Sequence, residues 1–424
     1  MRLCGAFSLR SFALAAVAAL TILAAASPAA AAQGDCGQPV TNGSAPTASD
    51  CLFILKAAVG SETCDPTCIC TPDGNGNITA SDALLCLKKA VGQSVTLNCP
   101  CGSGTTVTTI TVSTSSTTTT TTTVPSGANI IIVNGDGSSE GFNDKSSRSP
   151  VGGNDGNTLG KQRLNVFEAA ANIWEQEIQS NVDIRVLATF DSLFCNSTGA
   201  VLGSAGARNY FRDFNGALRG NTWFPAALAN KLRGIDLDPS KEDIIAQFNS
   251  AVGTTCPFPN VWYYGLDGNP PSGEIDLLSV VIHELGHGLG FATIVDLSTG
   301  QKGLGMGGDD AFMLKLEDHS KNENYPSMTD GERVTASVDS GDLHYEGAAV
   351  VAGSGFLIAG RHGPSGHVRM YAPNPAQPGS SVSHWDTVLS PDQIMEPVYV
   401  GPNHDIGLVR ELFDDIGWDG SLSP

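Results

Sequence analysis

Two stretches of regular hydrophobic spacing predict the secondary structure of the central chain. Apolar residues recur at helical spacing at Leu164, Phe167, Ala171, Trp174 and Ile178. Apolar residues then recur at every second position, at Val182, Ile184, Val186, Ala188 and Phe190. A period of about 3.6 residues is typical of a helix with one buried face, and a period of about two is typical of a half-buried strand. We therefore expect a long helix followed by a strand.

Shorter apolar segments extend this pattern. Residues 130–133 precede the helix, and residues 244–248 and 261–264 follow the strand; each is typical of a short strand. An apolar run at residues 275–282 is typical of a buried helix. A strand, a helix, a strand and further short strands that lead to a buried helix predict an α+β fold.

The apolar run leads into the sequence H-E-L-G-H at residues 283–287. Positions four apart lie on one face of a helix, so His283 and His287 can reach the same zinc ion. Glu284 lies beside them as the candidate general base of a zinc hydrolase. The alternative is an ordinary core helix that carries two structural histidines.

The residues after this motif resemble the metzincin zinc peptidases, whose longer pattern is H-E-x-x-H-x-x-G-x-x-H. Gly290 matches the glycine of that pattern, where the chain must turn sharply out of the helix. Thr293 stands at the place of the third histidine and is not a usual zinc ligand. Either the site is inactive or its third ligand comes from elsewhere.

A downstream segment supplies a candidate third ligand. Residues 380–397 read S-S-V-S-H-W-D-T-V-L-S-P-D-Q-I-M-E-P and contain His384 and Met395. Together with the closing D-D-I-G-W at 414–418, this segment resembles leishmanolysin, a metzincin whose third histidine is displaced by an insertion. The resemblance implies that His384 is the third zinc ligand and that Met395 forms the Met-turn beneath the metal. It also implies a metzincin-like catalytic domain with an irregular C-terminal subdomain.

Other residues compete for the place of the third ligand. Five further histidines are candidates: His319, His344, His362, His367 and His404. Glu317 would suit a thermolysin-like site with a downstream glutamate ligand. Only His384 has neighbours that resemble the family's motif.

The first 32 residues have the layout of a secretory signal peptide. Arg2 and Arg10 flank the start, an apolar run covers 12–26, and small residues end at Ala32, where we expect cleavage. No later segment approaches the length of an apolar membrane span. We expect a secreted protein with no membrane span, extracellular or associated with a cell surface.

Cysteine usage agrees with export. The chain has eleven cysteines; Cys4 leaves with the signal peptide, and the remaining ten suit disulfide pairing in an oxidising compartment. Eight of them crowd between Cys36 and Cys101, and Cys195 can pair with Cys256. The alternative for the crowded cysteines is a zinc cluster, suggested by the C-x-C pairs at 68–70 and 99–101.

Residues 33–101 contain an internal repeat, because the segment at 48–60 recurs at 80–92. The repeat resembles dockerin modules, which implies a small disulfide-rich helical module with calcium loops and a cohesin-like or cell-surface partner. The candidate calcium ligands in the second loop are Asp73, Asn75, Thr79 and Asp82. The alternative is a helix pair without metal.

Residues 102–127 are rich in Thr and Ser and predict a linker to a catalytic domain at 128–424. The net charge of −20 argues against nucleic acid and anionic membranes as partners. We expect a secreted zinc metalloendopeptidase that cleaves protein or peptide substrates. The alternatives are an adhesion or scaffold protein with an inactive peptidase-like domain, and a zinc hydrolase of non-peptide amides.

Overall fold

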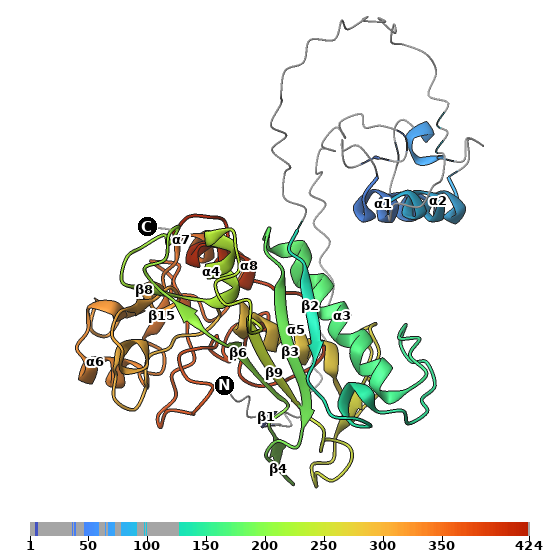
Figure 1. Cartoon of the computed structure of the whole chain (residues 1–424). Coiled ribbons are helices and arrows are strands. Elements are labelled where there is room, and N and C mark those ends of the chain that lie inside the picture. The colour runs from blue at the N-terminus through green and yellow to red at the C-terminus, as the bar shows by residue number, and fades with distance from the viewer. Residues whose placement is uncertain are drawn as a thin grey trace, which may run out of the picture. The chain divides into compact units, whose positions relative to one another are not determined.

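The computed structural model describes residues 5–6, 36, 38–39, 46–58, 64, 67–72, 78–90, 97, 99 and 127–422. The chain divides into two compact units (Figure 1). The larger unit contains residues 127–422, and the smaller contains the described residues from 36 to 99. The predicted signal peptide and linker lie outside the described residues, except for Gly127 and the two-residue strand β1 (Gly5–Ala6).

The smaller unit is a pair of helices, α1 (Ala48–Ala58) and α2 (Ala80–Ala90), with a 3-10 turn at Thr67–Cys70 between them. The two helices pack on each other around a small core of cysteine and aliphatic side chains. Three disulfides stabilise the unit: Cys51–Cys86 joins the helices, and Cys36–Cys99 and Cys64–Cys70 hold the segments around them. Since Cys70 and Cys99 form disulfides, the alternative of a zinc cluster on the C-x-C pairs is wrong.

The internal repeat is visible at the start of both helices. The carboxylate of Asp50 accepts hydrogen bonds from the backbone N–H and hydroxyl of Thr47, at 2.8 and 2.7 Å. Asp82 accepts the same pair of bonds from Thr79, at 2.9 and 2.7 Å. A threonine followed three residues later by an acidic residue is a common helix start, because it satisfies backbone donors that lack a partner.

A four-stranded sheet forms the centre of the larger unit, in the order β2 (Ile130–Asn134), β3 (Ile184–Asp191), β9 (Ile244–Asn249) and β6 (Gly203–Ala207). The first three strands are parallel, and β6 runs antiparallel to β9 at the edge. Alternate residues of β3 are buried, as the spacing predicts.

Helices α3 (Leu159–Glu177) and α5 (Leu277–Leu289) pack against this sheet and against each other, so they cover the same face (Figure 1). The α+β fold predicted from the sequence is confirmed. Edge-to-face contacts of Phe167 with Phe142 and Phe248, at 4.9 and 4.8 Å between ring centroids, fill the space between α3 and the sheet.

Shorter elements connect these layers. They are β4 (Cys195–Asn196), β5 (Gly199–Ala200), β7 (Tyr210–Phe211), β8 (Thr222–Pro225), α4 (Ala226–Arg233), β10 (Val261–Tyr263), β11 (Glu274–Asp276) and β12 (Asp309–Asp310). A disulfide joins Cys195 to Cys256, as predicted. Strand β11 pairs in parallel with β10 and leads directly into α5.

The C-terminal part is more regular than the sequence predicts. It contains a second sheet in the order β14 (Glu323–Asn324), β13 (Leu316–Asp318), β15 (Leu343–Tyr345) and β16 (Val368–Arg369). Helices α6 (Asp330–Ala336), α7 (Ala348–Gly353) and α8 (Val409–Ile416) accompany it. Strands of two or three residues are too short to show an alternating pattern, so periodicity misses them.

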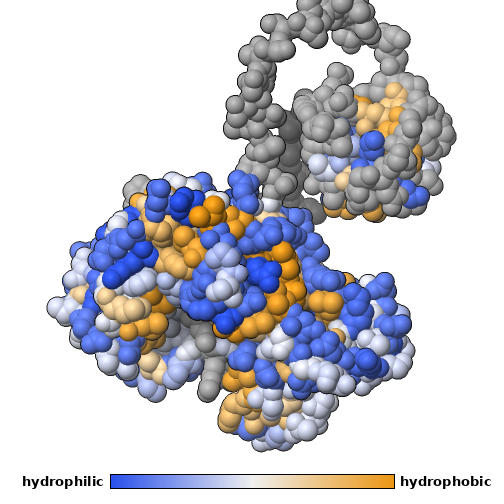
Figure 2. Space-filling view, viewed as in Figure 1, coloured by the Kyte–Doolittle hydropathy of each residue, from blue (hydrophilic) through white to orange (hydrophobic). Residues whose placement is uncertain are grey.

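No helix in the described part of the chain is long and apolar enough to cross a membrane. On the face of the larger unit seen in Figure 2, polar residues surround separate apolar patches.

Candidate metal centre

Helix α5 carries the H-E-L-G-H motif in the interior of the larger unit, and all of its residues are buried. Asp276 caps its start by accepting hydrogen bonds from the backbone N–H and the hydroxyl of Ser279, at 2.8 and 2.6 Å. The imidazole Nε2 of His404 lies 2.8 Å from the same carboxylate oxygen. These contacts hold the start of the helix against the C-terminal segment.

The structure brings His283, His287 and His384 together. The three Nε2 atoms lie 3.1 Å apart for His283 and His287, 3.1 Å for His287 and His384, and 3.2 Å for His283 and His384. All three side chains are buried, with His384 fully inaccessible. These residues form a group that could hold a metal ion.

The opposite nitrogen of each ring faces a backbone carbonyl. Nδ1 of His283 lies 2.6 Å from the oxygen of Ile394, Nδ1 of His287 lies 2.8 Å from that of Phe291, and Nδ1 of His384 lies 2.7 Å from that of Ser380. A carbonyl oxygen only accepts hydrogen bonds, so each Nδ1 carries the proton. Three Nε2 lone pairs then point toward one another, an arrangement that a cation satisfies.

The electrostatic environment keeps the three rings neutral. Burial lowers the pKa of His283 to about 4. Burial, reinforced by the neighbouring histidines, lowers the pKa of His287 and His384 well below the ordinary value. Neutral imidazole is the form that binds metals, so the site is ready for an ion at neutral pH.

The Nε2 spacing tests whether a zinc-sized ion fits. Three nitrogens spaced by these distances could all lie about 2.1 Å from one ion. Three protein ligands are one fewer than the four that zinc usually takes, so water or a substrate could supply the fourth. The donor set therefore fits a metal with an open coordination position.

Glu284 is the only acidic residue within the motif, and its side chain is fully buried. Burial raises its pKa to about 8, and the backbone of Ala205 opposes the rise in part. Within the described residues, neither carboxylate oxygen accepts a well-aligned hydrogen bond. A buried carboxyl without such partners is unstable as an anion unless a positive charge lies close to it.

Met395 lies beneath the motif. A Cβ atom built on Gly286 would lie 2.8 Å from the sulfur of Met395, so the methionine packs directly against the helix between the two histidines. The backbone N–H of Trp385 donates to the carbonyl of Met395 at 3.0 Å. This bond connects the segment of the third histidine to the methionine.

Thr293, at the position of the third histidine in the continuous motif, has a different role. Gly290 ends α5 with a φ of 135°, and the chain turns there as expected. The hydroxyl of Thr293 donates to Asp310 at 2.7 Å, and its backbone N–H donates to the hydroxyl of Ser383 at 3.2 Å. Thr293 thereby anchors the residue that precedes His384.

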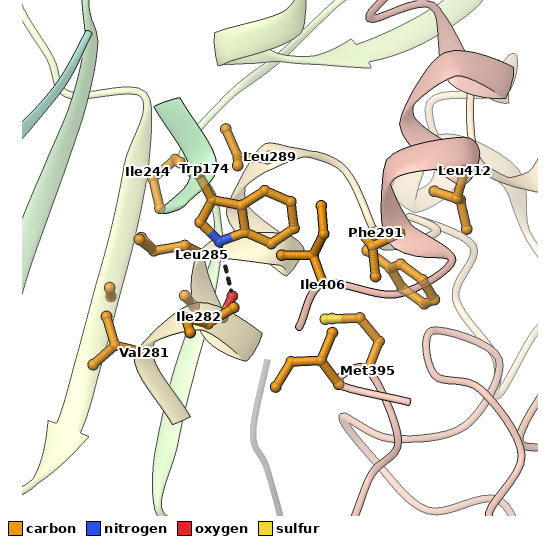
Figure 3. Packing of buried hydrophobic residues seen from close by; sticks show 14 of the residues in the cluster. Trp174, Ile244, Val281, Ile282, Leu285, Leu289, Phe291, Met395, Ile406 and Leu412 are labelled. Carbon is orange, nitrogen blue, oxygen red and sulfur yellow. Dashed lines mark hydrogen bonds between the residues drawn. The ribbon is translucent and has the colours of Figure 1, made fainter. Parts of the chain in front are cut away.

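Two tryptophans donate hydrogen bonds to backbone carbonyls of α5, and Figure 3 shows the first of them, Trp174. The indole N–H of Trp174, on α3, donates to the carbonyl of Ile282 at 3.0 Å. The indole N–H of Trp418, in the closing motif, donates to the carbonyl of Leu289 at 3.1 Å. Sequence reasoning gave neither residue a role at the site; the tryptophans act through backbone atoms, which side-chain spacing does not reveal.

A cavity of about 550 Å³ opens beside His283. Its lining includes Leu202, Val280 and residues of the segment from Pro391 to Gly407. Tyr399, in this wall, accepts a hydrogen bond from the backbone N–H of Asp276 at 3.0 Å. The phenol therefore helps to position the start of α5.

The competing ligand candidates do not join this group. Glu317, His319 and His367 form a second group that could hold a metal ion, and the rings of His344 and His362 lie against His319. His404 contacts Asp276 instead. The thermolysin-like alternative, with Glu317 as third ligand beside His283 and His287, is therefore wrong.

Only part of the predicted calcium loop is described. Asp73 and Asn75 lie outside the described residues, while Thr79 and Asp82 form the helix cap of α2. Calcium binding there stays a prediction.

Comparison of the chain with protein-family models, curated proteins and solved structures found no match.

Proposed function

We propose that the larger unit is a zinc-dependent peptidase of the leishmanolysin-like metzincin type. The observation that carries this proposal is the group of three buried Nε2 atoms, 3.1–3.2 Å apart, each with its Nδ1 committed to a backbone carbonyl. His283, His287 and His384 hold the ion, and Met395 supports their helix from below.

A bound zinc ion supplies a Lewis acid that polarises a substrate carbonyl and acidifies water. Glu284 accepts a proton from the attacking water and delivers it to the leaving amine. Its raised pKa supports this assignment, because the carboxyl ionises at neutral pH only with a cation nearby.

Strand β6 provides a surface along which a peptide can be held. Among the described strands it pairs on one side only, with β9, and so forms an edge of the sheet. A Cβ on Gly203, the first residue of β6, would lie 3.0 Å from Cγ of Glu284. An extended substrate that adds to this edge would pass the catalytic carboxylate, and backbone hydrogen bonds would fix its direction.

The cavity beside His283 suits one apolar substrate side chain. Leu202, Val280 and Ile394 give it apolar walls. Its volume is large enough for a leucine, methionine or phenylalanine side chain. We propose that the enzyme prefers such a residue next to the scissile bond.

The full chain is proposed to be a secreted endopeptidase with an N-terminal dockerin-like module that binds calcium and a cohesin-like or cell-surface partner. Four disulfides among the described cysteines are compatible with an oxidising compartment. The helix pair with equivalent caps supports a repeated module.

The experiment that tests the proposed activity is cleavage of casein by the full chain and by Glu284→Gln. Glutamine preserves the shape of the side chain but cannot accept the proton, so the rate falls by about 10²- to 10⁴-fold while zinc stays bound. Equal rates in the two proteins would contradict the role of Glu284. Zinc without cleavage of casein or a peptide library by the wild type would favour the scaffold or non-peptide hydrolase alternatives.

A further inference from the structure

The insertion between α5 and His384 carries a second cluster of histidines on one face of the small C-terminal sheet. Glu317 on β13 stands opposite His344 on β15, and His344 stands opposite Arg369 on β16. His319 and His367 lie one residue beyond the ends of β13 and β16, and both ring systems contact Glu317 on this face. Three separate segments thus bring an acid and three histidines together.

The atoms of three of these residues converge. Oε2 of Glu317 lies 2.8 Å from Nδ1 of His367 and 3.1 Å from Nε2 of His319. The two nitrogens are 3.0 Å apart. Oε2 of Glu317 is inaccessible to solvent, yet it accepts no well-aligned hydrogen bond from the residues that the structure describes. The buried oxygen thus lies beside two ring nitrogens.

From this geometry we propose that Glu317, His319 and His367 form a second site for a divalent transition metal of the zinc class. Three ligand atoms spaced by 2.8–3.1 Å fit an ion about 2.1 Å from each, lying about 1 Å out of their plane. Two imidazoles and one carboxylate are a ligand set that zinc accepts and that calcium and magnesium, which prefer oxygen, do not.

The surrounding residues hold this ligand set in place. The ring of His344 stacks on that of His319 at 3.9 Å, and its Nδ1 donates to the carbonyl of Asp342 at 2.9 Å. The positive charge of Arg369, on the same face, is directed to Asp386, with 3.3 Å between Nη2 and Oδ2. The loop that presents His367 is closed by a bond from the N–H of His362 to the carbonyl of His367, at 2.8 Å.

His362 is the candidate for a fourth ligand. Its ring is exposed and lies 4.4 Å from that of His319, and its Nδ1 contacts the hydroxyl of Ser365 at 2.8 Å. A rotation of this surface side chain would bring Nε2 to the ion and complete four-coordination, which is the usual geometry of structural zinc.

The site has a structural role in this arrangement. It joins β13 to the loop before β16, and the chain continues from β16 to Tyr371, whose N–H donates to the carbonyl of His384 at 2.9 Å. An ion bound there would stabilise the insertion and the segment that delivers His384. This role does not depend on the proposed peptidase activity.

The test is the zinc content of the full chain after loading with zinc chloride and dialysis. Wild type is expected to hold two ions per chain, and Glu317→Gln and His367→Ala one each. Glu323→Gln, a neighbouring carboxyl on β14, is the matched control and keeps two. A zinc content in both cluster variants equal to that of the wild type would overturn the proposal.

A second measurement keeps the test valid if a cluster variant fails to fold. In His287→Ala, which disables the first group, a titration with Co²⁺ should show one equivalent bound with visible absorption bands of Co²⁺ bound to nitrogen. Adding His319→Gln to this variant should abolish the bands. Absence of Co²⁺ binding in His287→Ala, or bands that survive His319→Gln, would overturn the second site.

Discussion

The sulfur of Met395 lies 2.8 Å from the point where a Cβ on Gly286 would stand. Cζ2 of Trp174 lies 3.4 Å from the same point, so the glycine faces a fully packed surface. The fourth residue of the H-E-x-x-H motif, Gly286, therefore has a structural requirement in this chain, since the helix approaches the methionine more closely than a side chain allows.

Gly286→Ala should destabilise the protein by about 1–3 kcal/mol, because the added methyl group overpacks the core. It should also weaken metal binding by shifting the helix between the two histidines. Thermal or denaturant unfolding and zinc affinity are the measurements. Gly331→Ala is the matched control, because Gly331 lies in α6 with no described atom within 4 Å of its Cβ position. Alanine there should leave stability unchanged or raise it by up to about 1 kcal/mol.

Thr293→Val should lower stability by about 1–3 kcal/mol, because it removes the donor to the buried carboxylate of Asp310. It should also weaken zinc binding, since the turn after α5 loses part of its link to the segment before His384. Thr335→Val makes the same substitution at an exposed position of α6, and as the control it should leave zinc affinity unchanged. A Thr293→Val protein with wild-type stability and zinc affinity would show that this anchor is unimportant.

The stability of the metal-free protein should depend on pH in two opposite ways. His283, His287 and His384 have lowered pKa values when folded, so the folded state binds fewer protons than the unfolded state below pH 6.5. Stability therefore rises with pH up to that value. Glu284 has a pKa raised from 4.5 to about 8, so the folded state binds more protons in this interval and stability falls as pH rises.

Among these four groups, the three histidines outweigh the one carboxyl below pH 6.5, and only the pKa of Glu284 lies above that value. Metal-free protein should thus be most stable near pH 6.5 and lose stability toward pH 8. In Glu284→Gln the loss should be smaller; a weaker decline remains because burial also raises the pKa of Glu396 to about 8. Denaturant unfolding in the presence of a chelator measures both curves. If the stabilities of the wild type and of Glu284→Gln fell equally between pH 6.5 and 8, the raised pKa of Glu284 would be contradicted.

Val280→Phe should change substrate preference, because Val280 lines the cavity beside His283. The larger side chain reduces the space, so kcat/KM for peptides with Phe next to the scissile bond should fall more than for those with Ala. A peptide library measures the ratio. An equal fall for all peptides would indicate that the cavity does not receive a substrate side chain.

The long-period features of the fold were predictable from the sequence. Helix α3 and strand β3 follow from their apolar spacing, and the meeting of His283 with His287 follows from the geometry of a helix turn. The position of His384 beside His283 and His287 was expected only because residues 380–397 and 414–418 resemble leishmanolysin. Apolar spacing does not predict how the long insertion between α5 and His384 folds.

Other parts of the site depend on contacts that no local pattern encodes. The links of Thr293 to Asp310 and Ser383 join segments far apart in sequence, and the bond from Trp418 to Leu289 uses a backbone oxygen. The second histidine cluster is assembled by strands of two or three residues, which are too short to be predicted. From the sequence, its histidines were therefore candidates for the third ligand beside His283 and His287.

The central claim is that His384 completes a zinc site with His283 and His287. The most direct measurement is zinc per chain and casein cleavage in Glu317→Gln, which lacks the second cluster, with and without His384→Ala. We predict that Glu317→Gln holds one zinc ion and cleaves casein, and that the added His384→Ala removes both the zinc and the activity. Retention of one zinc ion and of activity after His384→Ala would contradict the account.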